Sequence, residues 1–323
     1  MSKTPRFPPE PRAIAFVVFP DFQILDVAGP IAAFEIATRV SVSAYRLRVV
    51  AAKAGLVRSS SGVSMLAESL ARLRDVDTLI VTGGQGTPAA MEDNALLVAL
   101  GRIHPRVRRM ASVCSGAFVL AAGGLLDGKH ATTHWRQAPR LARLFPKVHV
   151  EPDRIHVREG KIWTSAGVTA GIDLALAMIG EDLGEEAATA VAREMVVYAK
   201  RPGGQAQHSA LLDLDAESDR FAKLNAWMRE HLSEDLSVER LACEAGMSER
   251  NFARLYADET GVTPAKAVER LRADAARAAL ERGGQIQEIA RKTGFGDPER
   301  MRRAFTRLYG APPAALRRTL RHA

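Results

Sequence analysis

A repeated pattern in the last third of the chain restricts its possible fold more than any other feature. Residues 241–248 are echoed by residues 289–296, an offset of 48 positions (289 − 241). Residues 261–264 are echoed by residues 310–313, an offset of 49 (310 − 261). Each copy has the pattern of a short helix, a turn that contains glycine, and a second helix. We therefore expect two helix-turn-helix units in the last third of the chain.

In the first copy, the second helix has an apolar stripe and a basic face. Phe252, Leu255 and Tyr256 have the i, i+3, i+4 spacing of a helix face that packs on a core. Arg250 and Arg254 are four residues apart and lie on the opposite face. Gly246 and Ser248 precede the helix, where they favour a left-handed turn and an N-cap.

The second copy repeats this division between a buried and an exposed face. Asp297 suits the N-cap and Pro298 suits the first helical position. The residues expected to face inward are Met301, Ala304, Phe305 and Leu308. Those expected to stay outside are Glu299, Arg300, Arg303 and Arg307.

A helix with exposed arginines fits the major groove of DNA, where arginine binds guanine edges and phosphates. The plainer alternative is a solvated helix face. Arg254 and Arg303 occupy equivalent places in the two copies, which favours DNA binding. The formal net charge of +8 and the pI of about 9.8 permit an anionic partner without demonstrating one.

Residues 236–264 followed by residues 289–313 resemble the AraC/XylS family of transcription regulators, over about the last hundred residues. The resemblance implies seven helices, with a long helix at 265–281 that joins the two units and lets them enter successive major-groove turns. It also implies six candidates for contacts with bases, of which Ala253 can offer only an apolar contact. They are Arg250, Ala253, Arg254, Glu299, Arg300 and Arg303.

Before residue 205, short β-branched runs alternate with amphipathic stretches, which favours an α/β domain with a parallel sheet and helices on both faces. Residues 149–163 have the pattern of a hairpin. The expected strands are 13–19, 45–51, 78–82 and 110–113, and the expected helices are 31–39, 94–103, 115–122 and 170–179. The expected divisions are a flexible arm at 1–12, a sensor domain at 13–204, a linker at 205–218 and a DNA-binding domain at 219–323.

Cys114 follows the strand at 110–113 and precedes a Ser-Gly turn and a helix, the layout of a nucleophile elbow. The start of that helix is expected to favour a thiolate. Gly83-Gly84 follows another strand and is expected to leave N–H groups free beside the elbow. Asp26 is placed in the loop after the first strand, and His134 just after a short strand.

Some of the cysteines and histidines also have a purely structural interpretation. A lone cysteine after a strand is often a buried structural residue, and Cys243 is expected to pack in the core. His130 and His134 are four apart, but on a strand this spacing does not make a zinc site. We therefore predict no metal and no cofactor.

The first two hundred residues resemble the PfpI/ThiJ superfamily, whose fold is flavodoxin-like and similar to class I glutamine amidotransferases. The motifs ILDVAGP, VTGG, SVCSGAFVLAAGGLLDG and ATTHW together resemble GlxA-type regulators, which fuse such a domain to an AraC-type one. The resemblance implies a pocket formed by Cys114, Asp26, His134, Gly83, Gly84 and Ser115. The peptidase-like members carry histidine where this chain has Ser115.

These features predict a sequence-specific transcription regulator that binds promoter DNA and senses a small metabolite through a degenerate catalytic pocket, rather than an enzyme. The main alternative is an isocyanide hydratase- or amidase-like enzyme that uses Cys114 with Asp26. A third hypothesis is redox sensing at Cys114. We also expect a homodimer, contact with RNA polymerase if the protein is an activator, no membrane segment, and a cytoplasmic location, in keeping with only two cysteines.

Overall fold

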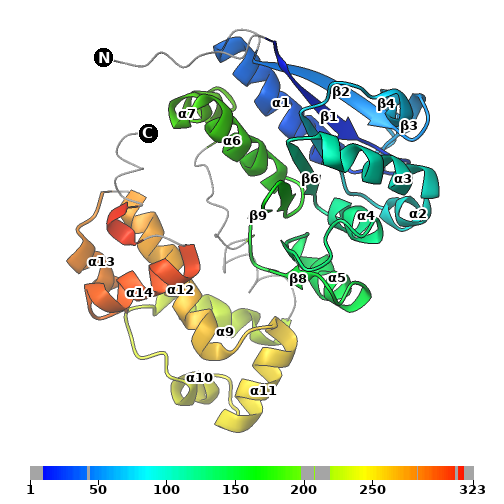
Figure 1. Ribbon diagram of the computed structural model, residues 1–323. Coiled ribbons are helices and arrows are strands. Elements are labelled where there is room, and N and C mark those ends of the chain that lie inside the picture. The colour runs from blue at the N-terminus through cyan, green and yellow to red at the C-terminus, as the bar shows by residue number, and fades with distance from the viewer. Residues whose placement is uncertain are drawn as a thin grey trace, which may run out of the picture. The chain divides into compact units, whose positions relative to one another are not determined.

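The protein divides into two compact units, residues 1–207 and 208–323 (Figure 1). The structure is a computed structural model that describes residues 10–41, 44–197, 207, 219–281, 283–309 and 312–315. Most of the expected arm and linker lie outside these residues. Of the seven helices implied for the second unit, six have bounds within the described residues. Within the described ranges, no helix is long and apolar enough to cross a bilayer.

The first unit is built on an eight-stranded, mostly parallel sheet with the strand order β3-β4-β2-β1-β5-β6-β10-β9. The parallel strands are β1 (Arg12–Val17), β2 (Tyr45–Ala51), β4 (Ser64–Ser69), β5 (Thr78–Val81), β6 (Arg109–Val113) and β10 (Ile162–Ser165). The two edge strands run antiparallel to their neighbours: β3 (Gly55–Arg58) and β9 (His156–Glu159). The central strands are buried along nearly their whole length because both faces of the sheet are covered.

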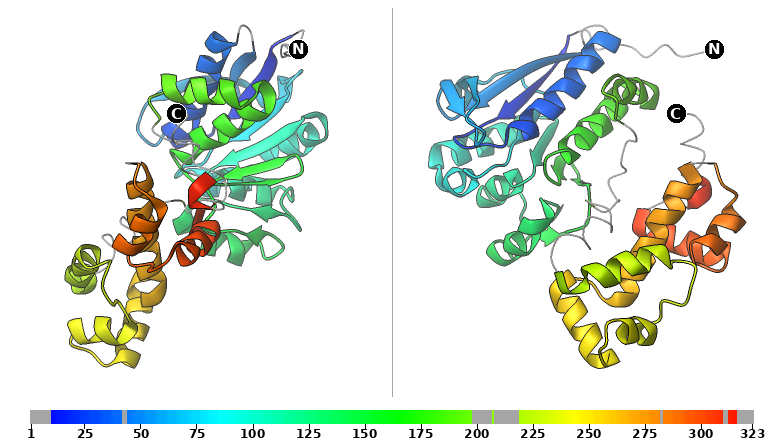
Figure 2. Two further views of the ribbon diagram at one scale, coloured as in Figure 1. Left: turned by 90° about the vertical axis from the view of Figure 1, so that its left-hand side faces the viewer. Right: turned by 180° about the vertical axis from the view of Figure 1, so that it is seen from behind.

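Helices cover both faces of this sheet (Figure 2). On one face α1 (Ile24–Val40), α6 (Ala170–Leu183) and α7 (Glu185–Glu194) pack together, and on the other α2 (Thr87–Glu92), α3 (Asn94–Ile103) and α4 (Gly116–Ala122) do. A smaller excursion holds β7 (His130–Ala131), α5 (Ala138–Leu144) and β8 (His149–Val150). Three short 3-10 helices complete the described part of the unit: η1 (Leu70–Arg72), η2 (His104–Arg106) and η3 (Trp135–Gln137). The predicted α/β architecture is confirmed.

The first helix begins earlier than the sequence suggested. Sequence analysis places residues 24–30 in the loop after the first strand and begins the helix at residue 31. Instead, α1 starts at Ile24 and contains Pro30, and Asp26 lies in its first turn. The close packing of α1 on α6 compensates for the hydrogen bond that a proline inside a helix removes, since a Cβ on Gly29 would lie 2.9 Å from the Ile172 side chain.

The edges of the sheet also differ from expectation. Strands β3 and β4 were missed because many of their side chains face solvent, so their sequences lack an apolar run. The hairpin predicted at 149–163 is shorter: only β9 and β10 form it, around Gly160 at φ +61°. Strand β8 instead pairs in parallel with β7.

The second unit is helical where it is described, and it contains the two expected helix-turn-helix units. Helix α12 (Pro264–Glu281) joins the unit formed by α10 (Val238–Glu244) and α11 (Glu249–Thr260) to the one formed by α13 (Ile286–Lys292) and α14 (Pro298–Tyr309). Helix α9 (Asp219–Glu230) precedes them and packs into the first of two separate hydrophobic cores.

The predicted faces of the helices are largely confirmed. Phe252, Tyr256, Met301 and Phe305 are fully buried. The Asp297 carboxylate accepts the Arg300 N–H at 2.9 Å and so caps α14, as expected. Ser248 does occupy the N-cap of α11, but its side chain makes no capping hydrogen bond. Cys243 is exposed rather than part of the core, because on α10 it is turned away from the buried Leu241 and Ala242.

Candidate functional site

The elbow of the first unit is a strained turn between β6 and α4. Cys114 has φ +56°, a left-handed conformation that residues other than glycine rarely adopt. Its backbone is held in place by neighbours: its N–H donates to the Ser165 carbonyl at 3.2 Å, and its carbonyl accepts the Thr133 hydroxyl at 2.8 Å. The thiol is thereby presented at the carboxyl end of the sheet.

Asp26 lies fully buried beside this thiol. One carboxylate oxygen accepts the Gly83 N–H at 3.0 Å and the other accepts the Val168 N–H at 3.1 Å. Burial raises the pKa of Asp26 to about 7, although these two bonds and one from the Cys114 thiol lower it. Asp26 is therefore a carboxyl group that takes up and releases a proton near neutral pH.

The surroundings of Cys114 strongly disfavour ionisation of its thiol. Burial raises its pKa to about 12, and the nearby charge of Asp26 adds to the effect, while hydrogen bonds with Ser115 partly oppose it. The expected thiolate is therefore wrong. Helix α4 has only seven residues, and its N-terminus does not outweigh burial next to a carboxylate.

The two glycines after β5 do lie against the elbow. A Cβ on Gly83 would lie 2.5 Å from the Ser115 nitrogen and 2.9 Å from the Cys114 Cβ, so only glycine fits there. Their N–H groups are not free, contrary to expectation: Gly83 donates to Asp26, and Gly84 donates to the Ser115 hydroxyl at 3.0 Å. The Ser115 hydroxyl also contacts that of Thr87 at 2.8 Å.

His134 reaches the same place from the other side. A Cβ on Gly167 would lie 2.5 Å from the His134 ring and 3.0 Å from the Cys114 sulfur, so both side chains flank this glycine. The His134 Nδ1 accepts the Arg136 N–H at 3.3 Å, and its ring stacks on Trp135. The structure thus brings together all the residues that the sequence assigned to the pocket.

The cavity next to the elbow is lined by a different set of residues. It has a volume of about 130 Å³ and opens on the Ser115 and Gly84 side, while Asp26, Cys114 and His134 are not among its lining residues. Its other polar lining side chains are Gln85, Thr87, Gln137 and Arg140. Sequence analysis missed Gln137 and Arg140 because helix α5, which Gln137 precedes and which contains Arg140, was not predicted.

A further polar contact comes from Gln207, the last residue of the first unit. Its amide NH₂ donates to the carbonyls of Thr133 at 2.7 Å and Pro152 at 2.8 Å, and its amide oxygen accepts the Trp135 N–H at 2.8 Å. Gln207 therefore fastens the end of this unit to the loop that carries His134. It falls in the predicted linker, and sequence analysis assigned it no role in the site.

The histidines do not converge on a metal. His130 lies 3.0 Å from the Glu151 carboxylate and packs against His149, while His134 faces Gly167. In the described ranges, no group of three or more His, Cys, Asp or Glu side chains is arranged to hold an ion.

In the second unit, the candidate DNA contacts lie on exposed faces of α11 and α14. The side chain of Arg254 is 63% exposed, that of Arg300 is 70% exposed and that of Arg303 is 63% exposed. Arg250 and Glu299 are exposed and Ala253 is partly exposed. Both helices therefore present positive charge to solvent at equivalent places in the repeat.

Comparison with known proteins agrees with this division of the chain. Residues 12–181 match the DJ-1/PfpI family, and residues 241–319 match a helix-turn-helix domain. The chain is 32% identical over 279 residues to the HTH-type transcriptional regulator GlxA of Rhizobium meliloti, covering 85% of each protein. The chain belongs to the GlxA-type regulators of the DJ-1/PfpI family.

Two further relatives of this GlxA-type regulator match only part of the chain. An isonitrile hydratase of Pseudomonas putida is 35% identical over 194 residues, which cover 58% of this chain and 79% of that enzyme. The crystal structure of a ThiJ/PfpI family protein from Pseudomonas syringae superimposes with a TM-score of 0.53 at 29% identity, covering 62% and 84% of the two chains. The match to an enzyme thus covers little more than half of the chain.

Proposed function

We propose that this GlxA-type regulator binds specific promoter DNA through α11 and α14 and adjusts that binding to a small metabolite bound beside the elbow. The observation that carries the proposal is the pair of exposed, arginine-bearing helices, one in each repeat. Helix α12 has 18 residues and so is about 27 Å long, which suits two helices that enter neighbouring turns of one duplex.

The test is direct binding to DNA. Random duplexes are enriched for those that the full-length protein retains, and affinity for the enriched sequence is measured by fluorescence anisotropy. Arg254→Ala and Arg303→Ala are each expected to weaken specific binding about tenfold or more, the loss of one bidentate base contact. Arg39→Ala, which removes an exposed arginine from α1, is the control. If both variants bind like the control, α11 and α14 are not the recognition helices.

The cavity beside Ser115 suggests the class of effector. Its volume of about 130 Å³ admits only a small molecule, and Arg140 is the charged residue in its lining, next to Gln85 and Gln137. A small anion or carboxylate with further hydrogen-bonding groups fits this lining best. It would act through a difference in its affinity for DNA-competent and DNA-incompetent arrangements of the protein.

A thermal-shift screen of small carboxylates against the wild-type protein tests this assignment. A true effector raises the melting temperature of the wild type, does so less in Arg140→Gln, and changes DNA affinity. Arg143→Gln, which alters another arginine of the same helix that does not line the cavity, is the control. A compound that stabilises all three proteins equally binds elsewhere.

Assembly and location follow from the same function. We propose a homodimer that places two DNA-binding units on paired half-sites, contact with RNA polymerase if the regulator activates, and action in the cytoplasm, where the DNA is. Sedimentation velocity of the free protein, and of the protein with one or two half-sites, tests the dimer.

One observation favours a second function for the first unit. The Asp26 carboxyl accepts a hydrogen bond from the Cys114 thiol and titrates near neutral pH, so it could move a proton to and from a substrate attacked by sulfur. Loss of an isocyanide, followed by its infrared band, would reveal such turnover in the full-length protein. Activity that disappears in Cys114→Ser and in Asp26→Asn would establish an enzyme, and its absence in the wild type would leave the pocket as a sensor.

A further inference from the structure

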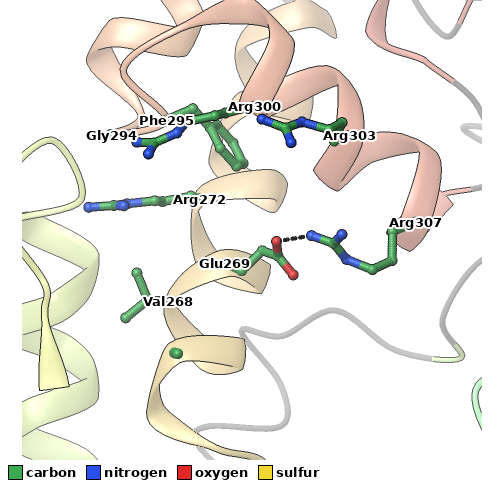
Figure 3. A pocket seen from close by; sticks show the side chains of 9 residues that line it. Val268, Glu269, Arg272, Gly294, Phe295, Arg300, Arg303 and Arg307 are labelled. Atoms are coloured by element: carbon green, nitrogen blue, oxygen red, sulfur yellow. Dashed lines mark hydrogen bonds and ion pairs between the residues drawn. The ribbon is translucent and has the colours of Figure 1, made fainter.

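A second hollow lies within the DNA-binding unit itself. Helices α12 and α14 enclose a groove of about 300 Å³ whose lining carries four arginines and one acid (Figure 3). The charged lining residues are Glu269, Arg272, Arg300, Arg303 and Arg307. The groove runs along the side of α14 that faces α12, next to the exposed face assigned to DNA.

The positive charge of this groove is only partly neutralised. Glu269 forms an ion pair with Arg307. Arg300 lies 3.8 Å from Asp297, and Arg303 lies 3.9 Å from Glu299, whose carboxylate is already bound by Arg302 at 2.7 Å. These distances are at the outer limit for ion pairs on an exposed surface, where such pairs contribute little. The groove therefore keeps three positive charges in excess of its one acid.

Arg272 is fixed at one side of the groove. Its Nε donates to the Leu232 carbonyl at 3.0 Å and its Nη2 donates to the Glu234 carbonyl at 2.7 Å. Both carbonyls belong to the loop before α10, so this guanidinium does not swing freely. Burial lowers the pKa of Arg272, the nearby Asp235 carboxylate partly opposes this, and the charge of Arg300 lowers the pKa further. Two like charges held this way are relieved by a bound anion.

Gly294 leaves the space that Arg272 occupies. It has φ +77°, and a Cβ there would lie 1.8 Å from the Leu232 oxygen and 2.6 Å from the Arg272 Nε. Gly246, the equivalent residue of the first repeat, would meet nothing within 4 Å. The arrangement is therefore a feature of the second repeat and does not follow from the helix-turn-helix pattern as such.

We propose that this groove binds a phosphate oxyanion, held by Arg272, Arg300 and Arg307. The proposal rests on the proposed function in one respect: a backbone phosphate of bound DNA is one source of the oxyanion, and a free phosphate compound is the other. Several guanidinium groups around one site suit the oxygens of a phosphate, which accepts charge-assisted hydrogen bonds from each. Arg300 then acts on phosphate rather than on a base.

Inorganic phosphate is the probe, titrated into the full-length protein by calorimetry at constant ionic strength. Arg307→Gln is expected to weaken binding about tenfold, the loss of one charge-assisted contact. Arg302→Gln is the matched control: both arginines lie on α14, both are exposed and both pair with a glutamate, but only Arg307 lines the groove. Arg300→Gln is a second variant, expected to behave like Arg307→Gln. No binding by the wild type, or an equal loss in Arg307→Gln and Arg302→Gln, would overturn the proposal.

A competition arm separates the two sources. If the groove takes a DNA phosphate, inorganic phosphate displaces DNA from the wild type at constant ionic strength, and Arg307→Gln lowers the salt slope of DNA binding by about one. If it takes a free compound, phosphate binds and leaves DNA affinity unchanged. A wild type that binds phosphate but no duplex would contradict the proposed function and leave the groove as a site for a free anion.

Discussion

At the scale of single residues, the elbow holds a protonated thiol beside a carboxyl group that titrates near neutrality. Burial dominates both groups, raising the pKa of Asp26 to about 7 and that of Cys114 to about 12. A thiol in this state is a poor nucleophile and reacts slowly with peroxide, because both reactions need the thiolate. This chemistry fits a site that recognises a ligand better than one that senses oxidants.

The first prediction concerns the reactivity of the two cysteines. Iodoacetamide at pH 7 is expected to modify the exposed Cys243 about a thousandfold faster than Cys114, because the raised pKa of Cys114 leaves almost no thiolate. Peptide mass spectrometry of timed samples measures both rates in one protein. Asp26→Asn removes a negative charge and should speed the labelling of Cys114. Equal rates in the wild type would restore the catalytic and redox hypotheses.

The second prediction concerns stability and pH. The folded-state pKa of Asp26, about 7, lies above its ordinary value of 3.8, so between these pH values the folded state keeps a proton that the unfolded state releases. The free energy of unfolding therefore falls as pH rises from 4 to 7, by at most about 1.4 kcal/mol per pH unit, and then levels off. In Asp26→Asn this pH-dependent part of the free energy of unfolding should be absent.

Calorimetry of the wild type, Asp26→Asn and Glu35→Gln between pH 5 and pH 8 measures the effect. Glu35→Gln removes an exposed carboxyl from the same helix and serves as the control. The melting temperature of the wild type relative to Asp26→Asn should fall by about 3 °C per pH unit up to pH 7. A difference that does not change with pH would mean that Asp26 is ionised throughout.

Sequence and structure agree on which residues meet at the elbow, but they differ on which side chains are protonated and which N–H groups are already hydrogen-bonded. The motifs and their family resemblance placed Cys114, Asp26 and His134 together. Charge state depends on burial and on which N–H groups are already bonded, and neither is visible in a motif. Arg140 and Gln207 were missed because their roles arise from contacts between segments far apart in the chain.

At the scale of elements, the two repeats look alike in sequence and pack differently. Gly246 and Gly294 both end the first helix of their unit with positive φ. The periodicity of α11 and α14 predicted their buried faces because each packs on one local core. It could not predict that the second turn meets the loop at Leu232, since that contact joins the second repeat to a loop that precedes the first repeat.

The third prediction follows from this difference. Alanine at either glycine costs about 1–2 kcal/mol from the left-handed backbone. Gly294→Ala should cost a further 1–3 kcal/mol or so, because its Cβ would collide with the Leu232 carbonyl and Arg272. Urea unfolding of both variants, followed by Trp227 fluorescence in the second unit, compares them. Equal losses would show that the contact between Gly294 and Leu232 does not contribute to stability.

At the scale of the whole molecule, the covalent connection between the two units begins at Gln207, the last residue of the first unit. The Gln207 side chain is hydrogen-bonded to the backbone of Thr133 and Trp135. The Thr133 hydroxyl in turn donates to the backbone carbonyl of Cys114. A ligand that shifts the elbow would therefore disturb the anchor through one intervening residue. Sequence analysis placed a linker between two units here, but the composition of a linker gives no sign of where its backbone is held.

The last prediction tests this anchor. In Gln207→Glu, a carboxylate replaces the donor to two carbonyls, so the end of the first unit should detach. Hydrogen exchange at the Trp135 N–H should then become faster, because that group loses its acceptor. A compound that stabilises the wild type and changes its DNA affinity should still stabilise Gln207→Glu but no longer change its DNA affinity. Gln137→Glu, a nearby substitution in the cavity lining, should instead alter ligand binding. A ligand changes DNA affinity only if it binds the DNA-competent and DNA-incompetent arrangements with different affinities. If the compound changes DNA affinity equally in Gln207→Glu and in the wild type, the Gln207 anchor does not couple the ligand to that difference, and the signal takes another route.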